Sequence, residues 1–351
     1  MTNNTITTLA QFLHQSEAEY NVFDMGRRVV KLSADEFVSF EKATAPYPYS
    51  LQKKALLGIV FWNPKQADKQ YVWFLGFPVD EQGLLVQAAR DEFLVMLLDR
   101  VGECMLAVEN GNKIESALKD SPYTFVPQQQ KMAAFNAQVT KCLSMPASSF
   151  YKPALAYFSG ISDRDHWQSL GMQGVADTAI RVADNDEKTI DIIKVLPHLP
   201  EEACTIFSIF LEHAEPVARL VEAFGQRLNM QLQQKEPDVN QICICLRAVS
   251  NSPAQGLVDE MVKRVLKHSS SQNIEVLATI TGRIWRVLEQ DLLCQMFLEQ
   301  LAHNNAGQEG FNQLIADVMY LPNMRQHIMV AIRSPQRSKA LTLAVANLLS
   351  N

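Results

Sequence analysis

The second half of this sequence, from about residue 150 onward, repeats one local pattern in which a short amphipathic helix ends and another begins. Helix-start signals that each follow an apolar periodic run mark the restarts, at Glu215-Pro216, Asn251-Ser252-Pro253, Asp291-Leu292 and Leu321-Pro322. We place proline at the first helical position, because the amide hydrogen that it lacks has no partner there. The spacing of roughly 30 to 40 residues is the length of one helix pair in HEAT-like or armadillo-like proteins.

This spacing predicts that residues 146–351 form an all-α helical-repeat (HEAT/armadillo-like) solenoid, with a compact multi-helix bundle as the alternative. We expect the first helices of successive pairs to begin near Glu201, Asp238, Asn273 and Gly310, and the second helices to follow Pro216, Pro253, Asp291 and Pro322. The repeat is degenerate, because no residue recurs in every unit. Stacked helix pairs create extended surfaces for partners.

Residues 1–145 instead mix helices with strands, which predicts an α+β domain built from antiparallel hairpins and covering helices. Two β-branched runs around Gly26 predict the first hairpin, and the runs 55–62 and 70–77 around a polar turn predict the second. Both faces of the last run are apolar. We therefore expect this strand, which contains Trp73, to be central in the sheet and covered on each side.

The first domain also carries clear helix signals. Ser33-Ala34-Asp35-Glu36 has the spacing of a capping box, which predicts a helix start. Further helices are expected over residues 84–101, 104–118 and 128–143. The small-residue stretch Pro146-Ala147-Ser148-Ser149 interrupts this periodicity and predicts the domain boundary, between an α+β domain at 1–145 and a helical domain at 146–351.

Length and charge narrow the classes of function. The chain has 351 residues, which is long for one hydrophobic core, and a formal net charge of −6. An acidic chain does not suit a general nucleic-acid binder, which needs a concentrated positive field. The first residues carry no positive charge typical of an export signal, and no stretch approaches the ~18 to 20 apolar residues of a membrane-spanning helix. We expect a soluble cytoplasmic protein without a membrane partner.

No motif in the sequence indicates catalysis or metal binding. The six cysteines show no CxxC spacing, and the seven histidines lie far apart. Cys243 and Cys245 are two residues apart in a helical pattern, so their sulfurs diverge by about 200° and cannot share one metal ion. Nucleotide-binding, hydrolase and zinc-protease motifs are absent from the sequence. We expect no catalytic residue, no metal and no cofactor, and interpret the cysteines as buried thiols in a reducing compartment.

Basic side chains form the strongest candidate for a binding surface. They occur where basic residues outnumber acidic ones, and fall in adjacent helix pairs, at Arg247, Lys263, Arg264, Lys267, Arg283 and Arg286. Stacking of successive pairs can bring them into one basic ridge. The sequence therefore favours a non-enzymatic adaptor or interaction protein that presents a solenoid surface to a protein partner, with a solvated surface ridge as the plain alternative.

Two other functions stay open. An enzyme or enzyme-accessory factor would have its site in the first domain or at the domain boundary, where Asp80, Arg90 and Asp91 could converge. An RNA-associated factor would use the basic ridge, or would stack bases on the strand aromatics Phe61, Trp62, Tyr71, Trp73, Phe74 and Phe77. Basic residues do not alternate with these aromatics as they would in an RNA-reading sheet, so core packing is favoured and nucleic acid is an improbable partner.

Several local patterns resemble one known family. They are Pro46-Tyr47-Pro48-Tyr49, Phe61-Trp62-Asn63-Pro64, Tyr71-Val72-Trp73-Phe74-Leu75, Asp80-Glu81-Gln82-Gly83 and Ala89-Arg90-Asp91-Glu92-Phe93. These patterns are similar to those of an uncharacterised proteobacterial family classed as a domain of unknown function, over the whole chain. The resemblance implies a bacterial cytoplasmic protein of about this length and implies no activity, cofactor or catalytic residue.

Overall fold

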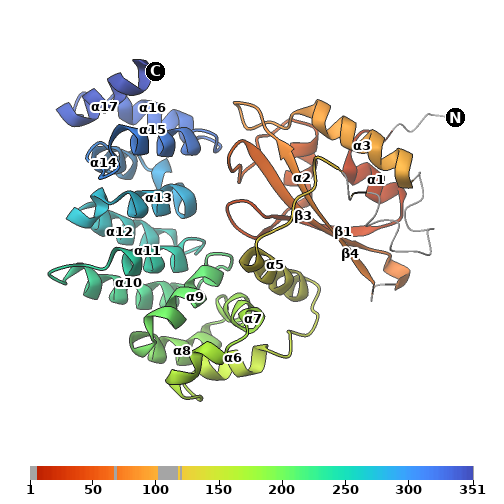
Figure 1. The fold of residues 1–351 in the computed structure, drawn as a ribbon, viewed down its shortest axis with the longest axis horizontal. Helices are drawn as coiled ribbons and strands as arrows, with labels where there is room; N and C mark the ends of the chain where they lie inside the picture. Colours follow the sequence, from red (N-terminus) through yellow and green to blue (C-terminus); the bar gives the residue numbers. More distant parts are fainter. Residues whose placement is uncertain (1–5, 67–68, 102–117, 119–120, 351) are drawn as a thin grey trace. The chain divides into compact units, whose positions relative to one another are not determined.

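The structure is a computed structural model that describes residues 6–66, 69–101, 118 and 121–350. Its contacts divide the chain into two units (Figure 1). The first comprises residues 1–131 and 320–322, and the second comprises residues 132–319 and 323–351. The first unit contains an antiparallel sheet with helices, and the second is helical, so a small sheet in the N-terminal part and a mostly helical chain are confirmed.

The sheet of the first unit consists of four antiparallel strands in the order β2-β1-β3-β4. The strands are β1 (Glu19–Asp24), β2 (Val30–Leu32), β3 (Lys54–Trp62) and β4 (Gln70–Pro78). β1 pairs with β2, and β3 pairs with β4, so both predicted hairpins are confirmed. β1 also pairs with β3, which joins the two hairpins into one sheet.

The prediction that the strand of Trp73 is central is wrong. β3 is central, and β4 lies at one end of the sheet formed by the described strands. Trp73 is nevertheless buried, with 4% of its surface exposed. The second apolar face of β4 is partly covered because a later segment runs beside its outer edge: Phe125 donates its N–H to the carbonyl of Phe74, and their rings are 5.9 Å apart. The apolar pattern predicts burial of both faces, but Val72 on the second face is 41% exposed. The pattern also does not identify which chain segment lies alongside.

Helices cover one face of this sheet. Tyr20, Phe61 and Tyr71 are successive cross-strand partners, so they share a face, and Phe77 shares it because side chains alternate along β4. The Tyr20 ring contacts Phe37 of α2 (Ala34–Glu41). Phe77 packs against a ring of α3 (Gln87–Val101), with centroids 5.6 Å apart. α2 and α3 therefore lie on the same face of the sheet.

Two helices that the sequence predicts in this unit are confirmed, α2 at the capping box and α3 within residues 84–101. α1 is Leu9–Gln15, and α2 begins with the predicted capping box: Ser33 accepts from the backbone N–H of Glu36, whose side chain accepts from the backbone of Ser33. η1 (Pro64–Gln66) is a short 3-10 helix in the second hairpin. The helix predicted at 104–118 lies outside the described residues, apart from Leu118.

The second unit is a series of short helices. They are α5 (Gln129–Cys142), which begins in the first unit, α6 (Tyr151–Phe158), α7 (Met172–Val182), α8 (Asp186–Val195), α9 (Glu201–Leu211), α10 (Ala218–Leu232), α11 (Val239–Val249), α12 (Gln255–Leu266), α13 (Ile274–Arg283), α14 (Asp291–Leu301), α15 (Gly307–Val318), α16 (Met324–Ile332) and α17 (Lys339–Ser350). Short 3-10 helices between them are η3 (Arg164–Ser169), η4 (Leu196–His198), η5 (Ser269–Gln272) and η6 (Trp285–Glu289). None of the helices in the described ranges is both long enough and apolar enough to cross a membrane.

The helices of the second unit pack in two rows, which Figure 1 shows stacked in chain order from α6 to α17. In the odd row, each of α7, α9, α11, α13, α15 and α17 packs against the next. In the even row, the same holds for α6, α8, α10, α12, α14 and α16. Side chains at the predicted starts cap α11 and α13, through Asp238 and Asn273. Each row thus brings together helices that are separated along the chain by one helix of the other row.

The prolines at the helix starts lie outside the helices, so the expectation of proline at the first helical position is wrong. Pro216, Pro253 and Pro322 each precede the residue at which the next helix is capped. The pyrrolidine ring disfavours helical backbone in the residue before it, and thereby separates each helix from the preceding one. The prediction of a helix start after each proline holds for this reason.

The two units divide between residues 131 and 132, inside α5, whereas the sequence suggested a boundary at 145/146, after this helix. The second half of α5 is bonded to the helical unit. Gln138 donates to the carbonyl of His213, and Lys141 donates to the carbonyl of Ile180. The apolar periodicity of α5 does not show which of its neighbours it packs against, so contacts far apart in sequence decide its place.

Candidate functional site

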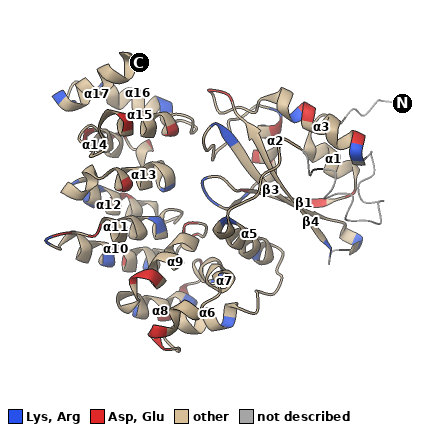
Figure 2. Ribbon diagram, in the orientation of Figure 1, with Lys and Arg blue, Asp and Glu red and all other residues tan. Residues whose placement is uncertain are grey.

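The structure separates the residues of the predicted basic ridge into groups. Arg247 and Arg283 come from α11 and α13 of the odd row. The remaining residues are elsewhere: Lys263 and Arg264 in α12 of the even row, Lys267 at the end of α12, and Arg286 in η6. Figure 2 shows basic and acidic segments interspersed along the helices of this unit.

Arg247 and Arg283 meet at Glu212, which follows the last residue of α9. Glu212 Oε2 lies 2.8 Å from Arg247 Nε and 3.4 Å from Arg283 Nε, and the carboxylate side chain is 3% exposed. His213 Nε2 lies 3.6 Å from Glu212 Oε1. A carboxylate buried to this degree requires compensating charge, and the two guanidinium groups supply it. The Glu212 cluster, defined as Glu212, Arg247 and Arg283, therefore joins three successive helices of the odd row.

The arginines of the Glu212 cluster remain partly accessible to solvent, with side chains 27% and 31% exposed. In the even row, Lys263 lies 3.1 Å from Glu260, and Arg264 donates to the side chain of Asn229. Sequence reasoning found the cations but missed Glu212. The one signal for this contact in the sequence is that Glu212 and Arg247 are 35 residues apart, which is about the length of one helix pair.

The residues of the alternative pocket do not share one set of contacts. Arg90 Nη2 lies 2.6 Å from Asp91 Oδ1, and Arg90 also donates to the carbonyl of Glu41. Asp80 instead accepts from the backbone N–H groups of Gln82 and Leu84 within its own turn. The structure thus pairs Arg90 with Asp91 and assigns Asp80 to a local turn.

Glu41, which the sequence did not single out, is a buried carboxyl group in the first unit. It is 2% exposed and accepts hydrogen bonds from the backbone N–H groups of Leu9 and Ala10 in the first turn of α1. Burial raises the pKa of Glu41 to about 7, which these hydrogen bonds and the charge of Arg90 partly oppose. Glu41 therefore links α2 to the start of α1 and titrates near neutral pH.

The strand aromatics belong mainly to the core. Phe61, Trp73 and Phe77 are each at most 4% exposed, and the rings of Phe61 and Trp73 are 4.6 Å apart. Core packing is confirmed for these three rings, which cannot stack on nucleic-acid bases without unfolding of the sheet. Trp62, Tyr71 and Phe74 are half-buried.

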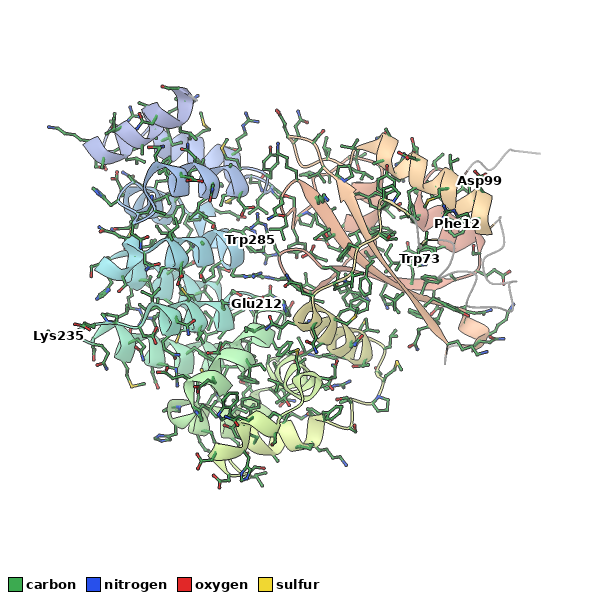
Figure 3. The ribbon with its side chains drawn as sticks, in the orientation of Figure 1. Phe12, Trp73, Asp99, Glu212, Lys235 and Trp285 are labelled. Atoms are coloured by element: carbon green, nitrogen blue, oxygen red, sulfur yellow. The ribbon has the colours of Figure 1, made fainter. Side chains whose placement is uncertain are left out.

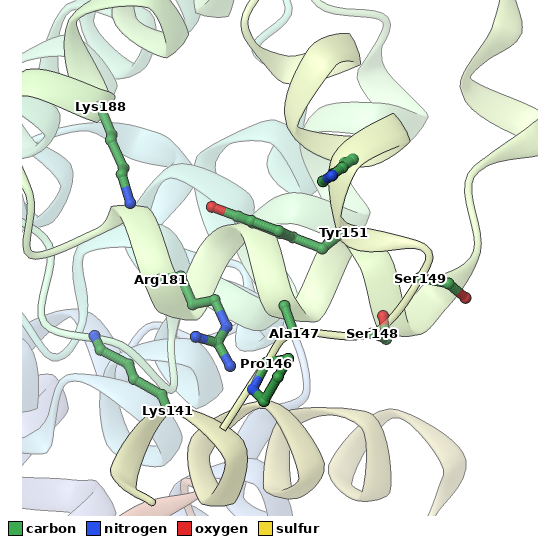
Figure 4. A pocket seen from close by; sticks show the side chains of 9 residues that line it. Lys141, Pro146, Ala147, Ser148, Ser149, Tyr151, Arg181 and Lys188 are labelled. Atoms are coloured by element: carbon green, nitrogen blue, oxygen red, sulfur yellow. The ribbon is translucent and has the colours of Figure 1, made fainter. Parts of the chain in front are cut away.

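A pocket of about 650 Å³ lies in the second unit, at the stretch that the sequence suggested to be a domain boundary (Figure 4). Its wall consists of Lys141, Pro146, Ala147, Ser148, Ser149, Tyr151, Lys152, Arg181 and Lys188. Four of these residues are basic and none is acidic. We call this feature the cationic pocket.

Four helices position the side chains of the cationic pocket. Lys141 lies near the end of α5, Tyr151 begins α6, Arg181 is in the last turn of α7, and Lys188 is in the first turn of α8. The segment from α5 to α6 is fixed to α7, because Arg181 Nη2 donates to the carbonyl of Met145 at 3.0 Å. Figure 4 shows the polar ends of Lys141, Tyr151, Arg181 and Lys188 on the same side of the pocket.

A close approach between α7 and the start of α6 also fixes this wall. A Cβ atom at Gly174 would lie 2.2 Å from the carbonyl oxygen of Phe150, so only glycine fits there. Ser148 donates its backbone N–H to Asp177 Oδ2, at 3.0 Å. Asp177 is itself 1% exposed. The loop is therefore bound to α7 by both sterics and hydrogen bonding.

Two buried polar atoms in the wall of the cationic pocket have no hydrogen-bond partner in the described part of the protein. They are Ser148 Oγ and Arg181 Nε. Lys141 Nζ pairs with Asp184 at 2.7 Å, where both side chains are partly exposed. Burial raises the pKa of Tyr151; the charge of Arg181 opposes this effect, and that of Asp177 adds to it. The site thus combines cations with unsatisfied hydrogen-bonding groups.

No group of three or more histidine, cysteine, aspartate or glutamate side chains within the described ranges could hold a metal ion. Cys204, Cys243, Cys245 and Cys294 have free thiols and are buried, whereas Cys142 is exposed. Burial raises the pKa of the four buried thiols, to about 12 in Cys294, which keeps them in the unreactive protonated form. Cys104 lies outside the described residues.

Comparison with known proteins identified one family. A family model described as "Protein of unknown function (DUF3549)" matches residues 4–349. No curated protein and no solved structure matched the chain. The match extends over nearly the whole chain and confirms the resemblance that the local patterns of the first unit suggested.

Proposed function

The chain belongs to this family of proteins of unknown function (DUF3549), and we propose that it is a non-enzymatic adaptor whose helical unit binds a protein partner. The observation that carries the proposal is the Glu212 cluster, which presents two arginines from successive helices on one row. The partner is a protein with acidic side chains.

The first support is the packing pattern of the helices. The principal helix contacts join elements one or two positions apart along the chain, as in α9, α11 and α13. This pattern is typical of a solenoid, in which each repeat contacts its neighbours, and a compact bundle would also pack distant helices together. Under this interpretation the second unit is an α-solenoid, and its row of odd helices is a continuous surface.

The second support is the orientation of the arginines. Glu212 binds the Nε side of both Arg247 and Arg283, which restricts rotation of the two side chains. An arginine that is already oriented loses less conformational entropy when it binds a carboxylate. Because each side chain is still partly exposed, each can donate hydrogen bonds to a second carboxylate, from a partner. The Glu212 cluster is therefore a suitable contact for an acidic protein surface.

Affinity capture from the native host tests this proposal, with the captured proteins identified by mass spectrometry. The odd-row variant combines Arg247→Gln and Arg283→Gln with Glu212→Gln, so that no buried carboxylate is left without its cations. Its control is the even-row variant Lys263→Gln with Lys267→Gln. We expect the odd-row variant to lose a specific partner that wild type and control retain at low salt. Capture by wild type should weaken as salt rises, because salt screens the charged contact. Melting curves establish that both variants are folded. Capture that is identical for all three proteins would contradict the proposed surface.

The enzyme alternative is favoured by one observation, the cationic pocket beside the predicted domain boundary. The RNA-associated alternative has less support, because Glu212 and Glu260 neutralise part of the charge of their basic neighbours. Electrophoretic mobility shift with single-stranded RNA at physiological salt separates it from the adaptor. If wild type binds the RNA tightly and the odd-row variant does not, the proposed partner of this surface would be RNA and not an acidic protein.

A further inference from the structure

We propose that the cationic pocket binds a small molecule through a phosphate monoester group. The site is independent of the Glu212 cluster, because the two have no residue in common. The first argument is charge. Lys141, Lys152, Arg181 and Lys188 line one cavity with no acidic side chain in its wall, in a chain whose net charge is −6.

The charge balance favours a dianion over a carboxylate. Four basic side chains outnumber the two carboxylates beside the wall, and so leave an excess of positive charge: Asp184 pairs with Lys141, and buried Asp177 accepts from the backbone of Ser148. A phosphate monoester carries a charge of about −1.5 to −2 at neutral pH and offers three acceptor oxygens. A carboxylate would neutralise less of this charge and would reach fewer of the donors.

The position of Arg181 gives support beyond charge. Its Nη2 atom donates to the side chain of Thr140 and to the carbonyl of Met145, so the guanidinium is already oriented in the pocket wall. An oriented guanidinium loses less conformational entropy when it binds an anion, and phosphate oxygens are strong acceptors for donors of this kind.

A third argument is the start of α6. The helix begins at Tyr151 in the pocket wall, and within the described residues its N-cap residue Phe150 makes no side-chain cap. Tyr151 donates its amide hydrogen to the carbonyl of Ser148 and Pro153 has none, so the helix contributes through its dipole, whose positive N-terminal end favours an anion. The positive end of α6 therefore adds to the potential of the basic side chains, within the same cavity.

The size of the pocket identifies the rest of the ligand as a small molecule. A volume of about 650 Å³ is larger than an inorganic phosphate ion requires and falls in the usual range of ligand sites. Pro146, Ala147 and the ring of Tyr151 provide an apolar part of the wall. The phosphate group thus occupies the basic part, and the body of a metabolite-sized ester contacts the apolar part.

Thermal shift and isothermal titration calorimetry test this site with the full-length protein. The probes are glucose 6-phosphate and AMP, the same molecules without phosphate (glucose and adenosine), inorganic phosphate and sodium sulfate at equal ionic strength. Because a ligand that binds only the folded state raises its stability, we expect a higher melting temperature with at least one ester. Glucose, adenosine and sulfate should give no shift, and inorganic phosphate should bind more weakly than the ester.

Lys188→Gln is the diagnostic variant, and Lys194→Gln is its matched control. Both lysines lie in α8, but Lys194 is outside the pocket wall and pairs with Asp191 on the surface. Loss of one charged donor should weaken binding of the ester about tenfold in Lys188→Gln, with no change in Lys194→Gln. Equal affinity of the two variants, equal binding of inorganic phosphate and esters, or no shift with any phosphorylated probe at millimolar concentration would each overturn the proposal.

Discussion

Replacing Glu212 by glutamine tests the energetic role of the Glu212 cluster. The substitution removes the negative charge and keeps the shape of the side chain and one carbonyl acceptor. Glu212 Oε2 is 2.8 Å from Arg247 Nε and 3.4 Å from Arg283 Nε. The variant therefore leaves two close cations that no longer share a carboxylate, which is the situation that destabilises a buried charge network.

The magnitude follows from charge separation and exposure. Two unit charges about 4 Å apart interact by about 4 kcal/mol at an effective dielectric constant of about 20. The arginine side chains are 27% and 31% exposed. Water can therefore solvate both guanidinium groups when glutamine replaces Glu212, and this solvation offsets part of the lost attraction. The remaining amide acceptor also retains part of the hydrogen bonding. We expect Glu212→Gln to lower the free energy of unfolding of the helical unit by about 2–3 kcal/mol.

Urea denaturation, followed by the helical circular dichroism signal, measures this loss without adding salt. Hydrogen exchange locates it, and we expect faster exchange in α9, α11 and α13 than in the sheet of the first unit. Lys263→Gln is the control, because its partner Glu260 is exposed and such pairs contribute about 0–1 kcal/mol. A loss below about 0.5 kcal/mol in Glu212→Gln, or exchange that changes equally in both units, would refute the reasoning.

Three further predictions concern substitutions of single residues. Burial raises the pKa of Glu41 from an ordinary 4.5 to about 7. Between these two pH values the folded protein holds a proton that the unfolded chain has released. The free energy of unfolding therefore falls as the pH rises through this window. Glu41→Gln should make the free energy of unfolding depend less on pH, as measured by urea titration at several pH values. Some dependence of the same sign should remain in this variant, because burial also raises the pKa of Asp24 to about 6. Trp73→Ala should cost about 3–5 kcal/mol in the same assay, because the ring is buried in the core of the sheet. Gly174→Ala should lower the melting temperature and weaken binding in the cationic pocket, because its Cβ would lie 2.2 Å from the carbonyl oxygen of Phe150.

Each of these predictions has a matched control in the chain. Asp35→Asn removes an exposed carboxylate from the same helix as Glu41 and is the control for loss of one negative charge in α2. Val72→Ala truncates an exposed residue next to Trp73 and should cost less than about 1 kcal/mol. Gly256→Ala places a methyl group where no atom lies within 4 Å and should be neutral or stabilising. Equal effects of a variant and its control would contradict the corresponding argument.

The sequence by itself determined the local elements of this protein. The capping box at Ser33 and Glu36, and the caps at Asp238 and Asn273, involve groups no more than three residues apart. Interactions over this distance depend on the backbone of one turn and the chemistry of the side chain, and both can be read from neighbouring residues. The hairpins follow similarly, because alternation and a polar turn define two adjacent strands.

The tertiary structure decided what these elements bring together. The end position of β4 depends on which strands pair, because burial of both faces of a strand does not specify its neighbours. Glu212 meets Arg247 across 35 residues, because α9 and α11 are neighbours in one row while α10 lies in the other. The cationic pocket likewise combines Lys141 with Arg181 and Lys188, whose separations exceed any local pattern. Such contacts depend on how whole helices pack, which is a sum over many apolar side chains and not a property of any short segment.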